Sequence, residues 1–263
     1  MDGELWLRLG VFVGLFLALA GLERLRPRRR LVERRGRRWP TTLGITVINT
    51  ALLRSLAVAL PLLAIGAAID ARAQGWGLFN RLDWPEGVEI VLAVLIFDLC
   101  IWAQHLITHK VPLFWRFHRV HHADRDFDVT TAVRFHPVEI AASMLLKIGL
   151  VYALGPAPVA VLAFEVLLSE TALFTHANPA LPQALDRTLR RVLVTPDMHR
   201  IHHSVHRHEH DSNYGFALSI WDRIFGTYRA TPDSGHDGMT VGLEWQDERP
   251  ARLGWSLMLP FRR

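Results

Sequence analysis

Long apolar runs separated by short polar segments dominate the first part of the chain. Three of them are "LWLRLGVFVGLFLALAGL" from Leu5, "TTLGITVINTALLRSLAVALPLLAIGAA" from Thr41 and "VEIVLAVLIFDLCIWA" from Val88. A helix needs about 20 apolar residues to cross a bilayer, because it rises about 1.5 Å per residue through about 30 Å of hydrocarbon. The pattern therefore predicts an all-α, multi-pass transmembrane helical bundle.

A fourth apolar region extends from Val138 to Thr175 and is divided by "GPAP" at 155–158. Each half is shorter than about 20 residues, so we expect a hairpin that enters the membrane and returns. This gives about four membrane-crossing elements, with short helices capping the cytosolic side. No linker divides the chain, so one integrated domain is expected. Its parts are the N-terminal helices and basic loop (1–87), a histidine-rich region (88–230) and a surface tail that lies on the membrane (231–263).

The distribution of charge predicts the orientation in the membrane. The segment "RLRPRRRLVERRGRR" follows the first apolar run, whereas a signal peptide carries its basic residues before that run. By the positive-inside rule this segment stays in the cytoplasm. It also contains most of the excess of 30 Lys and Arg over 25 Asp and Glu. We therefore expect no nucleic-acid partner. On this topology the histidines lie on the cytoplasmic side, and the arginine-rich, lysine-poor composition favours a bacterial inner-membrane protein.

Histidines occur only after residue 104 and concentrate in three motifs. "HRVHH" at 118–122 returns as "HRIHH" at 199–203, and "HLITH" at 105–109 precedes both. Positions i, i+3 and i+4 share one helix face, and imidazole is a strong ligand for iron, zinc, copper and nickel. Each motif is therefore expected to present two or three rings to a metal site. The eight candidate ligands are His105, His109, His118, His121, His122, His199, His202 and His203.

The number of ligands predicts the number of metals. His176, in "LFTHANP", is a plausible ninth ligand, and a single first-row ion accepts at most about six. Two ions are therefore expected to share the cluster. A charged residue in an apolar span is functional by default, so Asp98, two helical turns before His105, is the first candidate to hydrogen-bond a ligand. His136 and Asp197 are weaker candidates for that supporting role.

The remaining polar run "VHRHEHD" contains His206, His208 and His210. Its uniformly hydrophilic composition predicts a solvated segment outside the metal site.

The three motifs, in this order among membrane helices and followed by "NYGFALSIWDRIFGT" at 213–227, resemble the fatty acid hydroxylase / sterol desaturase superfamily. The resemblance covers roughly residues 90–228. It implies that the nine histidines hold two iron ions, with zinc as an ion that can replace them in purified protein. It also implies O₂ as co-substrate and a membrane lipid whose C–H bonds are hydroxylated or desaturated. No cytochrome b5-like domain is present, so electrons are expected from separate electron-donor proteins.

Two other functions are compatible with a histidine cluster. A di-zinc membrane hydrolase would need neither O₂ nor a reductant, but the chain lacks the HExxH motif that places a glutamate base. A metal transporter or store would need ligands along a path across the membrane, whereas these histidines gather at one end of the helices. The oxygenase is therefore the favoured prediction.

Overall fold

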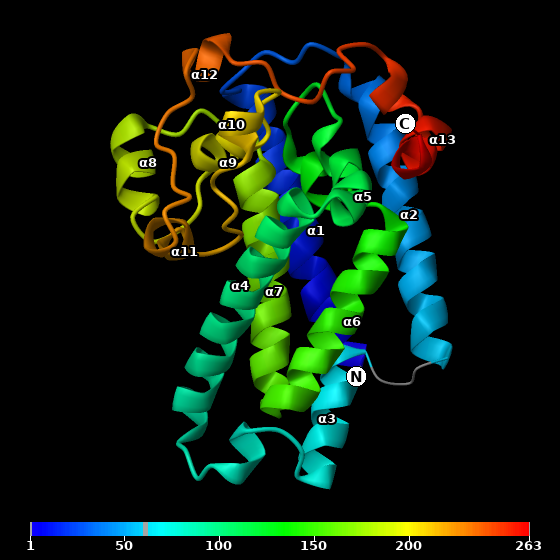
Figure 1. The fold of residues 1–263 in the computed structure, drawn as a ribbon, viewed down its shortest axis with the longest axis vertical. Coiled ribbons are helices and arrows are strands. Elements are labelled where there is room, and N and C mark those ends of the chain that lie inside the picture. The colour runs from blue at the N-terminus through cyan, green and yellow to red at the C-terminus, as the bar shows by residue number, and fades with distance from the viewer. Residues whose placement is uncertain (1, 60–62, 263) are drawn as a thin grey trace.

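Long helices form the body of the molecule, and short helices and loops cover one end of it (Figure 1). The structure is a computed structural model that describes residues 2–59 and 63–262. Those residues contain helices and no strand, which confirms the predicted all-α class. The long helices are α1 (Asp2–Leu25), α2 (Arg35–Ala59), α4 (Glu86–Lys110), α6 (Pro137–Leu154) and α7 (Pro158–His176).

The shorter elements connect or cap these helices. Two of them, α3 (Ala64–Gln74) and η1 (Phe79–Arg81), lie at the end of the molecule opposite the cap (Figure 1). The cap contains α5 (Pro112–His122), η2 (Val129–Val133), α8 (Gln183–Leu189), α9 (Pro196–His202), α10 (Arg207–His210), α11 (Ile220–Ile224), α12 (Gly235–Gly238), η3 (Arg249–Ala251), α13 (Leu253–Met258) and η4 (Leu259–Phe261).

Among the described helices, α4, α6 and α7 are long and apolar enough to cross a membrane. The protein is therefore an integral membrane protein. The predicted hairpin is present as α6 and α7, which are 18 and 19 residues long. At about 1.5 Å per residue each helix covers nearly the whole hydrocarbon core, so each is long enough to cross the membrane as well as to enter it.

The bundle core lies between α4, α6 and α7. Phe97 of α4 and Phe164 of α7 contact each other at a ring-centroid distance of 5.1 Å. Small residues of α3, including Ala64 and Ala67, pack into the same cluster. The hairpin turn is close to the loop after α3, since a Cβ on Gly77 would lie 2.2 Å from the backbone nitrogen of Gly155. Only glycine permits this close approach. The contact between the two segments fixes the end of the bundle opposite the cap.

Proline begins four of the helices that build the site, namely α5, α6, α7 and α9. Proline suits the first turn because its φ is already helical and its missing N–H would have no partner there. Thr195 completes the start of α9 by accepting a hydrogen bond from the backbone N–H of Met198 at 3.4 Å. The second histidine repeat therefore begins at a sharply defined residue.

The C-terminal segment is packed against the cap and is not the surface tail expected for residues 231–263. Trp255 and Leu259 are buried in a cluster with Ile45 of α2 and Val120 of α5. Arg134 fixes the segment further, since its guanidinium donates to the carbonyl of Pro250 at 2.7 Å and is fully buried. Trp255 and Leu259 thus complete the protein core, whereas Met258 and Phe261 of the same segment are exposed.

Candidate metal centre

Nine histidines converge within the cap as two adjoining groups, and they are the nine that the sequence predicted. Ligand atoms within each group lie within 4.8 Å of one another, and every ring is buried. The five-histidine group comprises His105, His109, His118, His122 and His202. The four-histidine group comprises His121, His176, His199 and His203.

Each H-x-x-H-H repeat is divided between the two groups. In the first repeat, His118 and His122 join the five-histidine group and His121 joins the other. The second repeat reverses this, since its first and last histidines join the four-histidine group and His202 joins the five-histidine group. Positions i and i+4 differ by about 40° around a helix, whereas i+3 lies on the other side of i. The repeat therefore serves two centres, and the expectation that all its rings aim at one point is wrong.

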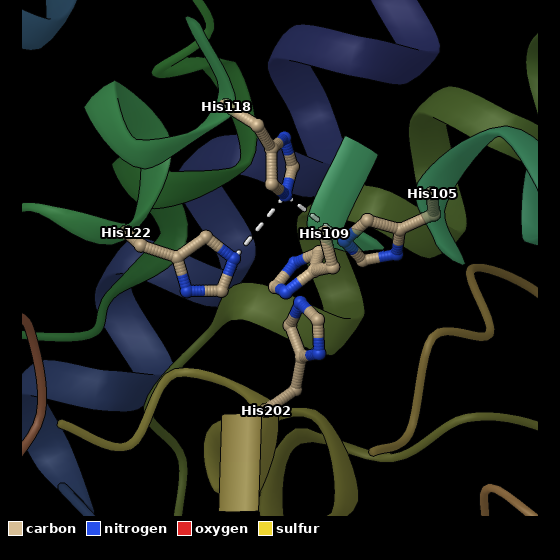
Figure 2. Close-up of side chains that lie close together, drawn as sticks. All are labelled: His105, His109, His118, His122 and His202. Atoms are coloured by element: carbon tan, nitrogen blue, oxygen red, sulfur yellow. Dashed lines mark hydrogen bonds between the residues drawn. The ribbon is translucent and has the colours of Figure 1, made fainter. Parts of the chain in front are cut away.

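The five rings of the first group come from α4, α5 and α9 and point toward a common centre (Figure 2). The Nε2 atom of His118 lies 3.1 Å from that of His105 and 3.2 Å from that of His122. In the four-histidine group, the Nε2 atom of His176 lies 3.1 Å from that of His121 and 3.0 Å from that of His199. Nitrogens bound about 2.0–2.1 Å from one ion are roughly 2.9 Å apart at right angles and 3.4 Å apart in a tetrahedron. The observed spacings fall within this range.

Backbone carbonyls and one carboxylate orient several of these rings. The Nδ1 atoms of His105, His202 and His176 lie 2.8 Å from the carbonyl oxygens of Tyr214, Ser212 and Ala172, respectively. His118 Nδ1 lies 2.6 Å from Oε1 of Glu139. A carbonyl or an ionised carboxylate can only accept, so Nδ1 carries the proton in each ring. In the neutral rings, Nε2 therefore presents a lone pair, as metal ligation requires.

One contact shows that the donor set suits a cation. His105 and His118 both donate through Nδ1, so neither neutral ring has a proton on Nε2, yet these two Nε2 atoms face each other at 3.1 Å. Two lone pairs at this distance repel each other and form no hydrogen bond. A cation bound by both nitrogens removes this conflict. The residues present therefore fit a metal ion.

Burial keeps the histidines outside the membrane helices neutral. Desolvation, followed by the proximity of other imidazoles, holds the pKa of His121, His122, His199, His202 and His203 well below the usual value. At neutral pH these rings are ready to bind a metal without first losing a proton.

A buried ionic network holds the first repeat in place. Arg38 of α2 donates to both carboxylate oxygens of Asp124, at 2.8 and 2.9 Å, and to Asp128 at 2.8 Å. Burial opposes ionisation of Asp124, but Arg38 and Arg134 still hold the pKa of this carboxyl below its usual value. Asp124 lies two positions after His122, with Ala123 between them. The network thus anchors the end of α5 to α2.

The closing segment at 213–227 supplies the carbonyl that orients His105. Asp222 is fully buried and accepts hydrogen bonds from the backbone N–H groups of Tyr214 and Gly215 at 2.8 and 2.9 Å. It also accepts from the Trp102 indole of α4 at 3.0 Å. Asp222 therefore fixes the Tyr214 carbonyl against α4, where the His105 ring lies.

Asp98 was predicted to hydrogen-bond a histidine of the metal centre, but its contacts in the structure are with other residues. Its Oδ2 accepts hydrogen bonds from the indole of Trp221 at 2.8 Å and from the backbone N–H of Leu218 at 3.2 Å. Among the residues described, no histidine hydrogen-bonds to it. Asp98 lies two helical turns before His105, beside the closing segment at 213–227 and not beside the histidine rings. It therefore anchors that segment to α4.

His136 and Asp197 have supporting roles outside the two groups. His136 accepts a hydrogen bond from the backbone N–H of Val138 at 3.2 Å and thus caps α6. Asp197 forms ion pairs with Arg200 and with Arg28, the latter at 3.3 Å, in the first turn of α9. The charge pairs of Asp197 hold the helix that bears the second repeat, without contact to a ligand ring in the part of the chain described.

Two residues beside the five-histidine group were missed by the sequence prediction. Glu139, the partner of His118, lies 21 positions away in the chain, and no spacing rule connects the two. His210 was expected in a solvated run, but only 8% of it is exposed and its ring stacks on Trp115 at 5.3 Å. An acidic residue at the start of an apolar helix was the one available signal for Glu139.

A cavity of about 390 Å³ between the long helices reaches the five-histidine group. His105 and His118 form part of its wall, together with residues of α1, α2, α4, α6 and α7. None of the four-histidine group is among the described residues that line it. The volume is in the range of small-molecule binding sites, so the cavity offers an approach to one of the two groups from among the long helices.

These features define an integral membrane helical bundle with a buried histidine cluster suited to metal ions. The sequence profile described as "Fatty acid hydroxylase" matches residues 90–227, which is more than half of the chain. The chain belongs to the fatty acid hydroxylase family. The predicted superfamily is thereby confirmed.

Named relatives support this assignment. The chain is 31% identical to alkylglycerol monooxygenase of Homo sapiens over 171 residues, covering 64% of this chain and 36% of the relative. It is 32% identical to ornithine lipid hydroxylase OlsE of Rhizobium tropici over 151 residues, 57% of this chain and 44% of the relative. It is 27% identical to cholesterol 25-hydroxylase of Rattus norvegicus over 149 residues, which cover 56% of this chain and 48% of the relative. The match thus spans less than half the length of each of these relatives. No solved structure matches.

Proposed function

We propose that the protein is a membrane-bound di-iron oxygenase that uses O₂ to oxidise C–H bonds of a lipid. The observation that carries the proposal is the cavity among the long helices, which ends at two rings of the five-histidine group. A hydrophobic substrate can approach this group from the bilayer. The names of the relatives, which refer to an alkylglycerol, an ornithine lipid and cholesterol, support an amphipathic lipid as substrate.

The two groups would each hold one iron ion, with His105, His109, His118, His122 and His202 around one and His121, His176, His199 and His203 around the other. When bound, the iron pair supplies the oxidant that removes hydrogen from the lipid. The protein contributes ring orientation through the carbonyl contacts of His105, His202 and His176. Glu139 keeps the proton of His118 on the nitrogen that faces away from the group.

The reaction consumes reducing equivalents. In hydroxylation, one oxygen atom of O₂ enters the lipid and the other leaves as water, with two electrons and two protons supplied from outside. We assign the electrons to a separate electron-donor protein. The arginine segment contacts the cap directly, as the hydrogen bond from the Val32 N–H to Asp126 at 2.8 Å illustrates. By the positive-inside rule we place this cap on the cytoplasmic face. The arginine-rich, lysine-poor composition leads us to propose a bacterial inner membrane.

Lipid mass spectrometry of cells that express the protein tests the proposal. Cells with the wild-type chain should contain one lipid class that has gained an oxygen atom or lost two hydrogen atoms. His121→Ala and His202→Ala, one from each group, should abolish the change while the protein still inserts into the membrane. A mutant that still forms the product, or wild-type cells with unchanged lipids, would contradict the proposal.

A further inference from the structure

Two residues that line the cavity have a buried acceptor atom without a hydrogen-bond donor among the described residues, namely Asn49 at Oδ1 and Glu139 at Oε2. Both side chains line the cavity, as do His105 and His118. Asn49 is 7% exposed, and the Glu139 side chain is 10% exposed. Leaving a buried acceptor unsatisfied costs about 1–3 kcal/mol, so each such atom in a folded protein calls for an explanation.

The orientation of both groups is fixed by their other atoms. Asn49 donates through Nδ2 to the carbonyl of Phe135 at 2.9 Å, and because a carbonyl only accepts, the amide oxygen must be the free end. Glu139 uses Oε1 to accept from His118 Nδ1 at 2.6 Å, which leaves Oε2. Two elements far apart in the chain, α2 and α6, thus each contribute to the wall of one cavity a residue with an unsatisfied acceptor.

We propose that Asn49 and Glu139 bind a hydroxyl-bearing polar group of the lipid and thereby direct oxidation to carbons near that group. This inference rests on the proposed function and narrows its substrate class. A hydroxyl donates the hydrogen bond that each acceptor lacks. Glu139 is separated from the metal-facing nitrogen of His118 by one imidazole ring, so a hydroxyl held there keeps the adjoining carbons beside the five-histidine group.

The charges of the cavity disfavour an anionic group at this end. A phosphate or carboxylate offers only acceptors when ionised and would face the Glu139 carboxylate. The cationic residues that line the cavity, Lys147 and Arg8, lie elsewhere in the bundle. Both form ion pairs with Glu165, at 3.0 Å and 2.8 Å respectively. On one helix Lys147 lies eight residues beyond Glu139, which is about 12 Å. A neutral group with hydroxyl donors therefore fits this end of the cavity better than an anion does.

The test compares two probes on the purified, iron-loaded full chain in detergent. One is a hexadecyl glycerol ether with both hydroxyls free, and the other is the same lipid with both hydroxyls methylated. Their affinities are measured from the rise in apparent Tm with lipid concentration, which needs no turnover. The wild type should bind the free diol more tightly. Asn49→Leu should weaken diol binding about tenfold and leave the methylated lipid unaffected, because one hydrogen bond is lost.

Two further variants complete the design. Glu139→Gln keeps an acceptor for His118 but presents an amide N–H in place of Oε2, so the preference for the diol over the methylated lipid should narrow. This variant also tests the proposal if Asn49→Leu does not fold. The matched control is Thr50→Val, since Thr50 lines the same cavity but already donates to the Thr46 carbonyl at 2.9 Å. It should bind both probes as the wild type does.

Equal affinity of the wild type for both probes would overturn the inference, as would an equal loss in Thr50→Val. Failure of the wild type to bind the diol would do the same. These results concern binding only. A failure of the proposed function would appear instead as unchanged lipids in expressing cells, so the two outcomes are distinguishable.

Discussion

The two histidine groups are built from the same repeats but differ in access and in ligand number. The five-histidine group borders the cavity and has a carboxylate, Glu139, behind one of its rings. The four-histidine group does not border the cavity, and aromatic rings cover it, with Phe135 stacked on His121 at 4.2 Å and Phe127 5.0 Å from the ring of His203. For the proposed lipid substrate, this difference in access predicts approach to the five-histidine group, with the four-histidine group shielded from it.

Ligand number makes the sharpest test of this difference. His203→Ala leaves three histidines in the four-histidine group, whereas His109→Ala leaves four in the other. Because four nitrogen ligands suffice for a tightly bound ion, His203→Ala should lose about one ion per chain and His109→Ala should lose much less. Metal analysis of the purified variants measures this. Equal loss in both would remove the distinction between the groups.

Substitution of Arg38 tests a support that both histidine groups share. Arg38 anchors the first repeat, whose histidines belong to both groups. Arg38→Met leaves the carboxylates of Asp124 and Asp128 buried without their main partner. Breaking such a buried pair costs about 3–5 kcal/mol, which corresponds to a fall of roughly 10 °C in the apparent Tm of the detergent-purified protein. Arg30→Met, at an exposed arginine of the same region, is the control and should leave Tm within about 2 °C. A stable Arg38→Met protein would show that the network does not hold α5.

Acid should release metal from both groups, at a pH below the ordinary range for histidine. Protons compete with the metal for the same lone pair, and the folded protein holds the pKa of His199, His202 and His203 well below about 6.5. Metal content should therefore stay constant as the pH falls from about 8 to 6.5 and decline only at lower pH. Desalting at stepped pH followed by metal analysis measures the profile. Loss beginning above about pH 6.5 would contradict the neutral, buried cluster.

Asp98→Asn should have the smallest effect. The amide oxygen of the variant can still accept from Trp221 and Leu218, so only the contribution of the charge is lost, about 1 kcal/mol. Metal content should remain that of the wild type in both groups. A clear loss of metal in this variant would restore the role in ligand support that the sequence had predicted.

The sequence predicted eight of the clustered histidines because their spacing within the three motifs is a local property, and His176 was added as a single plausible ninth. It could not divide them into two groups, since that division depends on how α5 and α9 face each other. It also missed Glu139, whose contact with His118 arises only when the start of α6 packs beside α5. Asp98 shows the opposite error, because a shared helix face indicates proximity to His105 but not the presence of Trp221, a more accessible partner.

The membrane helices likewise show that local sequence patterns can be predicted, whereas tertiary packing cannot. The apolar runs predicted α4 and the α6–α7 hairpin from composition alone. The C-terminal segment was misjudged because its apolar residues have no regular period. Their destination against Ile45 and Val120 is set by tertiary packing.

The iron content of the purified wild-type chain, expressed with iron available, tests the central claim most directly. Five and four convergent imidazoles predict about two metal ions per chain. A value of one or less in folded protein would contradict the existence of two centres and the oxidation chemistry proposed for them.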